Sequence, residues 1–210
     1  MARGSKHPQP IIPVAARTPL TAVKAAAYCV HGRRWWCAVV ALAVASAAWP
    51  AQAEPTLGLA YGAWQEMRRE QLDVSIASPF RTTWRGHEIT LAWTVDVARW
   101  RSVKHADGGP DTLYEIGFAP RVRMLAAATP LGHPYVEAGI GLHALSGKRI
   151  FNHELGVPVL FGSFAGFGLR FGAREEFAVS AGAMHESNAG IKQPNHGLTV
   201  VLVRFEYALP

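Results

Sequence analysis

Residues 112–126 read TLYEIGFAPRVRMLA, and large apolar side chains occupy every second position of this segment. The apolar positions are Tyr114, Ile116, Phe118, Pro120, Val122 and Met124. Apart from Leu113, the positions between them hold small or charged residues, namely Glu115, Gly117, Ala119, Arg121 and Arg123. Successive side chains of a β-strand point to opposite faces. A period of two therefore predicts a strand with one large apolar face and one small, polar face.

The same alternation recurs after Ala53 in further segments of roughly ten residues, separated by turn residues. We count eight segments: 56–66, 69–79, 87–100, 112–126, 134–146, 157–171, 175–186 and 197–207. No run of about 18 apolar residues follows Ala53, which argues against a transmembrane helix in that part of the chain. The sequence therefore predicts an all-β fold, an eight-stranded antiparallel barrel.

Alternation alone does not say which face of the barrel points inward. A soluble barrel of the lipocalin type buries its large apolar residues, whereas an outer-membrane barrel turns them toward lipid. Here the smaller face carries charges of both signs and the glycines Gly117, Gly139, Gly141, Gly166, Gly168 and Gly182. Eight strands enclose too little space for a full set of large side chains. We therefore predict a transmembrane β-barrel, with a soluble lipid-binding barrel as an alternative.

The N-terminal region has the composition of an export signal. Six of the 21 basic residues lie in 1–53, which contains no acidic residue. Arg33-Arg34 precedes an apolar run over 35–45, and Ala51-Gln52-Ala53 fits a small-x-small cleavage site. The run is too short to span a bilayer, which disfavours an N-terminal membrane anchor. We predict a signal peptide and N-terminal extension over 1–53, cleavage after Ala53, and an outer-membrane barrel over 54–210.

The predicted barrel region is electrically neutral, because its 15 basic residues are balanced by 15 acidic ones. A neutral domain has no electrostatic reason to collect on phosphate backbones, so we expect no nucleic-acid partner. Both cysteines, Cys29 and Cys37, lie in the predicted leader. Disulfides, cysteine-based metal sites and cysteine nucleophiles are therefore excluded from 54–210.

Loop lengths predict the orientation of the barrel. With both termini in the periplasm, the connections 101–111, 147–156 and 187–196 face outward, and all three are long. The connections around 129–132 and 172–174 are tight and face the periplasm. Long loops outside and short turns inside are the pattern of bacterial outer-membrane barrels, although the first outward connection is short.

The seventh segment ends in a pair of side chains that can perform chemistry. His185 and Ser187 fall on its apolar, lipid-facing stripe, at the outward end. A histidine beside a serine can accept the hydroxyl proton and so generate a nucleophile. Pairing the last two segments around a loop centred near Lys192 places Thr199 opposite His185, where a group that orients the imidazole would lie.

Residues 185–197, HESNAGIKQPNHG, resemble the H-x-S-N-A-G and P-N-x-G signature of the lipid A 3-O-deacylase family (PagL). That family consists of eight-stranded outer-membrane barrels that hydrolyse the ester-linked acyl chain at position 3 of lipid A. The resemblance implies that Ser187 is the nucleophile and His185 the general base. It further implies an oxyanion hole from Asn195 and the Gly190 backbone N–H, with Asn188 holding the loop or assisting. One departure is clear: Thr199 stands where the family has an acidic residue, so its catalytic role is in doubt.

These observations predict an outer-membrane carboxylic ester hydrolase, a lipid A 3-O-deacylase, whose partners are lipid A or lipopolysaccharide and membrane lipid. No metal and no organic cofactor are implied. The alternative is a non-catalytic small outer-membrane barrel, an adhesin or structural protein, in which Thr199 marks lost activity. Whether the barrel forms a homodimer stays open.

Overall fold

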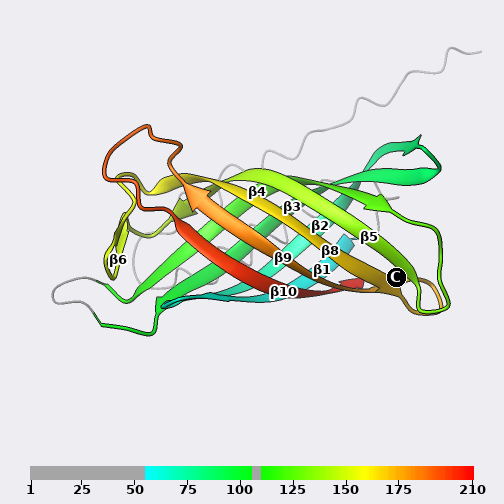
Figure 1. Ribbon diagram of the computed structural model, residues 1–210, viewed down its shortest axis with the longest axis horizontal. Helices are drawn as coiled ribbons and strands as arrows, with labels where there is room; N and C mark the ends of the chain where they lie inside the picture. The colour runs from blue at the N-terminus through cyan, green and yellow to red at the C-terminus, as the bar shows by residue number, and fades with distance from the viewer. Residues whose placement is uncertain (1–54, 106–109) are drawn as a thin grey trace, which may run out of the picture. The chain divides into compact units, whose positions relative to one another are not determined.

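The structure, a computed structural model, describes residues 55–105 and 110–210, which form an all-β protein (Figure 1). Eight long strands are β1 (Pro55–Trp64), β2 (Met67–Trp84), β3 (His87–Ser102), β4 (Thr112–Leu125), β5 (His133–Leu145), β8 (Val159–Phe171), β9 (Phe177–Ser187) and β10 (Leu198–Ala208). Two short strands, β6 (Arg149–Ile150) and β7 (His153–Glu154), form a hairpin between β5 and β8. Within the described ranges there is no helix long and apolar enough to cross a membrane. The predicted leader, 1–53, lies outside the described residues.

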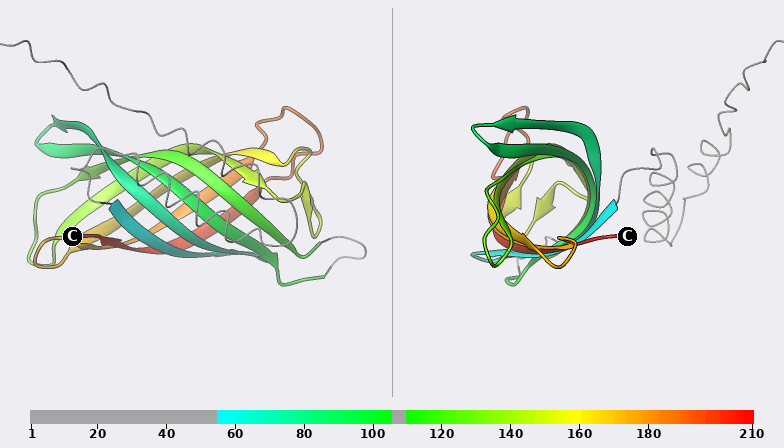
Figure 2. Two further views of the ribbon diagram at one scale, coloured as in Figure 1. Left: turned by 180° about the vertical axis from the view of Figure 1, so that it is seen from behind. Right: turned by 90° about the vertical axis from the view of Figure 1, so that its right-hand side faces the viewer.

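The eight long strands close into one barrel in the order β1-β10-β9-β8-β5-β4-β3-β2 (Figure 2). Every neighbouring pair is antiparallel, including the β1–β10 pair that closes the sheet. The barrel sheet therefore closes on itself with no open edge strand, which is the condition for a sheet to exist in lipid. The predicted eight-stranded antiparallel barrel is confirmed.

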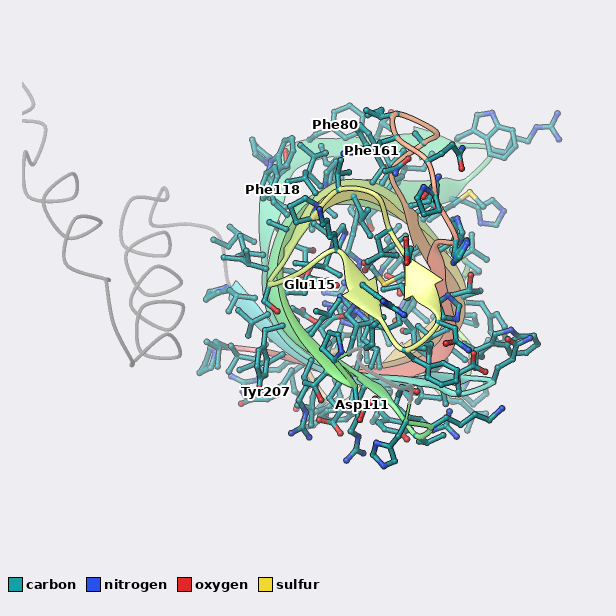
Figure 3. The ribbon with its side chains drawn as sticks, turned by 90° about the vertical axis from the view of Figure 1, so that its left-hand side faces the viewer. Phe80, Asp111, Glu115, Phe118, Phe161 and Tyr207 are labelled. Atoms are coloured by element: carbon teal, nitrogen blue, oxygen red, sulfur yellow. The ribbon has the colours of Figure 1, made fainter. Side chains whose placement is uncertain are left out.

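The two faces of the wall differ as the alternation predicts. Large apolar side chains stay exposed on the outside; Ile116, Phe118, Ile140, Val203 and Phe205 are all between 45% and 62% exposed. In the end-on view, Phe118 and Phe161 point outward and Glu115 points into the lumen (Figure 3). An apolar outer wall of this kind is stable only against lipid. The predicted transmembrane barrel is therefore confirmed, and the soluble alternative is not.

Buried ion pairs fill the middle of the lumen. Arg69 lies 3.1 Å from Asp96 and 2.5 Å from Glu115, and Arg121 and Arg123 both pair with Glu137. Charges can be buried at this depth because each has an oppositely charged neighbour within hydrogen-bond distance. The glycines and alanines of the inner face leave the room that these long side chains need.

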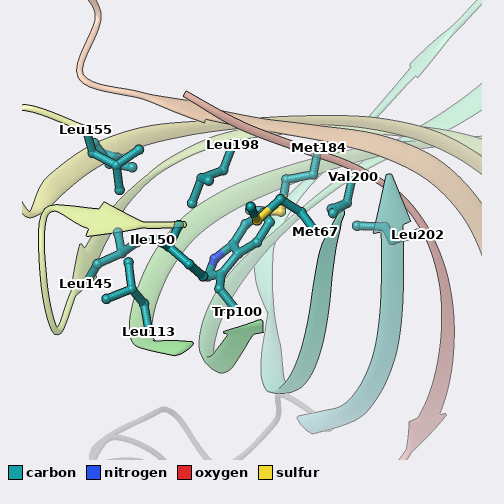
Figure 4. Packing of buried hydrophobic residues seen from close by; sticks show 11 residues of the cluster. Met67, Trp100, Leu113, Leu145, Ile150, Leu155, Met184, Leu198, Val200 and Leu202 are labelled. Atoms are coloured by element: carbon teal, nitrogen blue, oxygen red, sulfur yellow. The ribbon is translucent and has the colours of Figure 1, made fainter. Parts of the chain in front are cut away.

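A hydrophobic cluster closes the end of the barrel at which β3 ends and β4 begins and which carries the loops 146–158 and 188–197; we call it the long-loop end. Its members are Met67, Trp100, Leu113, Leu145, Ile150, Leu155, Leu160, Met184, Leu198, Val200 and Leu202 (Figure 4). Ile150 and Leu155, contributed by the β6–β7 hairpin and the residue after it, are fully buried in the cluster. The hairpin is thereby fixed beside the last loop of the chain, which carries the predicted site.

The strand bounds differ from the predicted segments in two places. β2 runs to Trp84 and pairs with β3 as far as Trp84↔His87, so residues 80–86, expected as a connection, extend a hairpin at the opposite end. A bulge between Ala77 and Arg81 shifts the register without changing the faces. The segment 147–156, expected as a long outward connection, contains the β6–β7 hairpin.

Candidate active site

The end of β9 places His185 and Ser187 on the outer wall and turns the residue between them inward. The His185 side chain is exposed and Ser187 is half-buried. Glu186 is fully buried in the lumen, where its carboxylate lies 3.6 Å from His143 and 3.8 Å from Arg69. His185 and Ser187 therefore share the outer face of β9, as predicted, and the barrel wall separates Glu186 from His185.

Thr199 is the hydrogen-bond partner of the imidazole. The β9–β10 register pairs Thr199 with His185, as the loop-centre argument predicts. Their side chains meet, with His185 Nδ1 2.9 Å from Thr199 Oγ1. When Nδ1–H donates to this oxygen, the lone pair of Nε2 is free to accept a proton. Among the residues described, no carboxylate is hydrogen-bonded to His185; neither Glu186 nor Glu154 takes that place.

Ser187 is the last residue of β9 and pairs with Phe161 of β8. Residues two apart on one strand face have Cα atoms about 7 Å apart, close enough for an imidazole to turn toward a hydroxyl. Within 55–105 and 110–210 no hydrogen bond joins Ser187 Oγ to His185. Hydrogen bonds of a catalytic pair are commonly long without substrate and tighten when it binds.

The loop that follows Ser187 is organised around Asn188, which is fully buried. Its Nδ2 donates to the carbonyls of Leu155 and Lys192, at 2.8 and 2.7 Å. Its backbone N–H donates to Asn195 Oδ1 at 3.1 Å. The Asn188 side-chain amide thus holds the loop together. The hydrogen bond from the Asn188 backbone fixes Oδ1 of Asn195 and leaves Nδ2 of Asn195 to donate elsewhere.

Two glycines of the loop adopt the left-handed conformation, with different surroundings. Gly190 has a φ of 79°, and a Cβ built there would meet nothing within 4 Å, so its backbone is open to an approaching ligand. Gly197 has a φ of 65°, and a Cβ there would lie 2.8 Å from His185 Cε1. Gly197 therefore allows the imidazole to lie directly against the backbone. This contact between Gly197 and His185 has no counterpart in the sequence motif, where Gly197 is only the last residue.

One group of buried residues in the lumen has the side chains of a metal site. Atoms of Asp96, Glu115 and His143 that could ligate a metal lie within 4.8 Å of one another. The Arg69 guanidinium, however, already contacts both carboxylates, and His143 Nδ1 lies 2.8 Å from Glu115. A cation there would have to displace Arg69, so these side chains fit an ion-pair network better than a metal.

The fold and the site together define a membrane-spanning β-barrel with a histidine and a serine on the outside of its wall, followed by a loop that carries two asparagines. Residues 47–208 match the family described as lipid A 3-O-deacylase (PagL), and the chain belongs to that family.

Named relatives agree with this assignment. The chain is 32% identical over 126 residues to the lipid A deacylase PagL of Pseudomonas aeruginosa, covering 53% of this chain and 71% of the relative. It is 29% identical over 174 residues to the lipid A deacylase PagL of Bordetella bronchiseptica, covering 80% and 92%. A crystal structure of the outer membrane enzyme PagL superimposes with a TM-score of 0.65 and 27% identity, covering 73% of this chain and 99% of that one.

Proposed function

We propose that this chain is a lipid A 3-O-deacylase of the outer membrane, in which Ser187 attacks the ester carbonyl and His185 is the general base. Family membership supports the reaction, and the register of β9 and β10 supports the residues. The observation that carries the proposal is the position of His185, hydrogen-bonded to Thr199 on the outer wall and two residues from Ser187.

The reaction follows from these positions. Nε2 of His185 takes the Ser187 proton as Oγ adds to the carbonyl, and Nδ1–H donates to Thr199. The negative oxygen that forms accepts from Asn195 Nδ2 and the Gly190 N–H. Collapse releases the sugar hydroxyl, which takes the proton from His185, and leaves an acyl-serine. Water, deprotonated by the same imidazole, then hydrolyses the acyl-serine to a free fatty acid.

The outer position of the site sets how the substrate arrives. A serine that faces lipid meets an acyl ester in the plane of the bilayer, and the acyl chain lies along the apolar wall. We assign the long-loop end to the cell exterior, where the ester would be at headgroup depth in the outer leaflet. Residues 1–53 would direct export, and sequencing the N-terminus of the mature protein would test cleavage after Ala53.

Expression of the wild type and Ser187→Ala in a bacterial strain with intact lipid A tests the function. We expect mass spectrometry of lipid A to show loss of the 3-linked acyl chain with the wild type only. Both proteins should reach the outer membrane and show heat-modifiable mobility on gels. Identical lipid A from the two strains would instead favour the non-catalytic small barrel.

A further inference from the structure

The His153 side chain connects three segments that are far apart in the sequence, one of which is the backbone at Gly197. His153, in β7, lies with Nδ1 3.0 Å from the Gly197 carbonyl oxygen. Its other ring nitrogen, Nε2, lies 3.3 Å from Oε1 of Glu66, in the turn between β1 and β2. The turn, the β6–β7 hairpin and the last loop are thus linked through one imidazole. We call Glu66, His153 and the Gly197 carbonyl the clamp.

The two partners of His153 determine which form of its ring can make both hydrogen bonds. The Gly197 carbonyl can only accept a hydrogen bond, and so can an ionised carboxylate. A hydrogen bond from its own backbone N–H lowers the pKa of Glu66 below its usual value, and His153 lowers it further, so this group is ionised at neutral pH. Both ring nitrogens must therefore carry protons for both bonds to exist, and the clamp is complete only with an imidazolium at position 153.

The clamp is adjacent to the general base. A Cβ at Gly197 would lie 2.8 Å from His185 Cε1 and 3.4 Å from Nε2, so the backbone of residue 197 forms one wall for the imidazole. The hydrogen bond to the Gly197 carbonyl holds that wall in place. If it is released, the loop can move away from the ring, and the Thr199 hydrogen bond alone then positions the His185 imidazole.

We propose that His153, through its contacts with Glu66 and the Gly197 carbonyl, is a positioning residue that fixes Gly197 against His185 and makes deacylation depend on a doubly protonated ring at position 153. This inference rests on the proposed function. His153 does not touch the reacting atoms and acts through the loop backbone. A displacement of the order of 1 Å at a reacting group can cost about a hundredfold in rate, so a partial loosening of one wall should cost about tenfold in kcat.

Other charged and titratable groups face the clamp. Lys104, in the loop after β3, attracts the Glu66 carboxylate, and the His196 ring lies edge-on to His153 at 6.4 Å between centroids. His196 Nδ1 is itself close to the Asn152 carbonyl, at 3.0 Å. Glu154 adjoins His153 in β7 and its backbone N–H donates to His196. Glu66 remains the carboxylate that contacts the ring.

Substitutions at His153 test the clamp, with the full-length enzyme purified in detergent and assayed on lipid A in mixed micelles. His153→Phe keeps a ring and removes both hydrogen bonds; we expect kcat to fall about tenfold and KM to stay within about twofold. His153→Asn carries an amide at the level of Nδ1 and should restore most of kcat. His105→Gln is the matched control, because it removes an exposed imidazole that pairs with Asp111 on the same end of the barrel.

Glu66→Gln distinguishes the protonation requirement from simple contact. A glutamine amide can donate to Nε2, so a neutral imidazole with Nδ1–H can then make both bonds. We expect near-wild-type kcat at pH 7 in this variant. The ratio of wild-type to His153→Phe activity should be higher in acidic than in alkaline buffer, because only a doubly protonated ring can donate to both Gly197 and Glu66. In the Glu66→Gln background the same ratio should stay level.

Two results would overturn the clamp. One is equal kcat for the wild type and His153→Phe. The other is a ratio of wild-type to His153→Phe activity that does not change with pH while Glu66 is present. Both proteins must first show the folded gel mobility, and His153→Asn separates a lost hydrogen bond from a misfolded hairpin. These outcomes do not affect the proposed function, because that is tested by comparing lipid A from strains that express the wild type and Ser187→Ala. If those two were equal in lipid A composition, the function itself would fail before the clamp is tested.

Discussion

His185 Nδ1 lies 2.9 Å from Thr199 Oγ1, across the β9–β10 pair, and this contact ends in a hydroxyl rather than a carboxylate. A carboxylate only accepts, so it forces the proton onto Nδ1 and leaves Nε2 as the base. A hydroxyl both donates and accepts, so it permits either tautomer of the imidazole. It also gives the imidazolium no opposite charge.

Thr199→Glu should therefore make the enzyme faster. The loss of a triad acid costs up to about 10⁴-fold in a serine protease, and we expect kcat here to rise by at least about tenfold with KM little changed. Thr199→Val, which keeps the shape and removes the bond, should lower kcat about fivefold, the equivalent of about 1 kcal/mol. Steady-state rates on lipid A micelles measure both. If neither substitution changes kcat, the Thr199 contact has no part in catalysis.

Gly197→Ala should abolish most activity while the barrel still folds. The added methyl meets His185 Cε1 at 2.8 Å, and the left-handed backbone adds about 1–2 kcal/mol of strain. Gly86→Ala is the control, because its φ of 82° carries similar strain and a Cβ there meets nothing within 4 Å. We expect a loss of about a hundredfold in kcat for the first variant and wild-type rates for the second. Equal rates would show that the imidazole has room to move away from residue 197.

Substitution of the two asparagines of the last loop should impair different properties of the protein. Asn195→Ala removes a proposed oxyanion donor and should lower kcat by about 10²–10³-fold. Asn188→Ala leaves the Leu155 and Lys192 carbonyls without their donor and should loosen the whole loop, so that protease cleaves it faster. Limited proteolysis beside rate measurements separates the two. Asn152→Ala, an exposed residue of the β6–β7 hairpin, serves as the reference. Unchanged kcat in Asn195→Ala would remove that residue from the oxyanion hole.

Arg69→Met should destabilise the barrel itself. It leaves Asp96 and Glu115 without their shared cation in the lumen, which costs about 3–5 kcal/mol when one partner of a buried pair is removed. Arg81→Met breaks an exposed pair with Glu88 and should cost about 1 kcal/mol or less. Urea unfolding in detergent, followed by gel mobility, compares the two. Similar unfolding midpoints would mean that the Arg69 network does not hold the wall together.

The fold and the positions of His185 and Ser187 could be predicted because both depend on a period of two. Alternation fixed which residues share a face, and so placed His185 and Ser187 outside and Glu186 inside. Antiparallel pairing around a loop centred near Lys192 was enough to bring Thr199 opposite His185. These are local rules, and a single sequence carries them.

The clamp could not be predicted because it depends on irregular backbone. Glu66, His153 and Gly197 come from a turn, a two-residue strand and a loop, and no periodicity links their positions. The only local signal was the glycine itself, whose positive φ is a known reason for that residue type. The extension of β2 to Trp84 was missed for a different reason, because polar residues and a bulge interrupt the apolar stripe there.

The hydrophobic cluster under the β6–β7 hairpin has a consequence for the product. Trp100, Ile150 and Leu155 close one mouth of the cylinder, and paired charges fill its middle, so the barrel cannot serve as a conduit for a fatty acid. In the proposed reaction, an acyl chain freed at Ser187 has the surrounding bilayer as its exit and leaves by lateral diffusion. Turnover would then depend on how fluid the neighbouring lipids are, and cooling the membrane below its melting transition should slow the enzyme more than cooling the detergent-solubilised form.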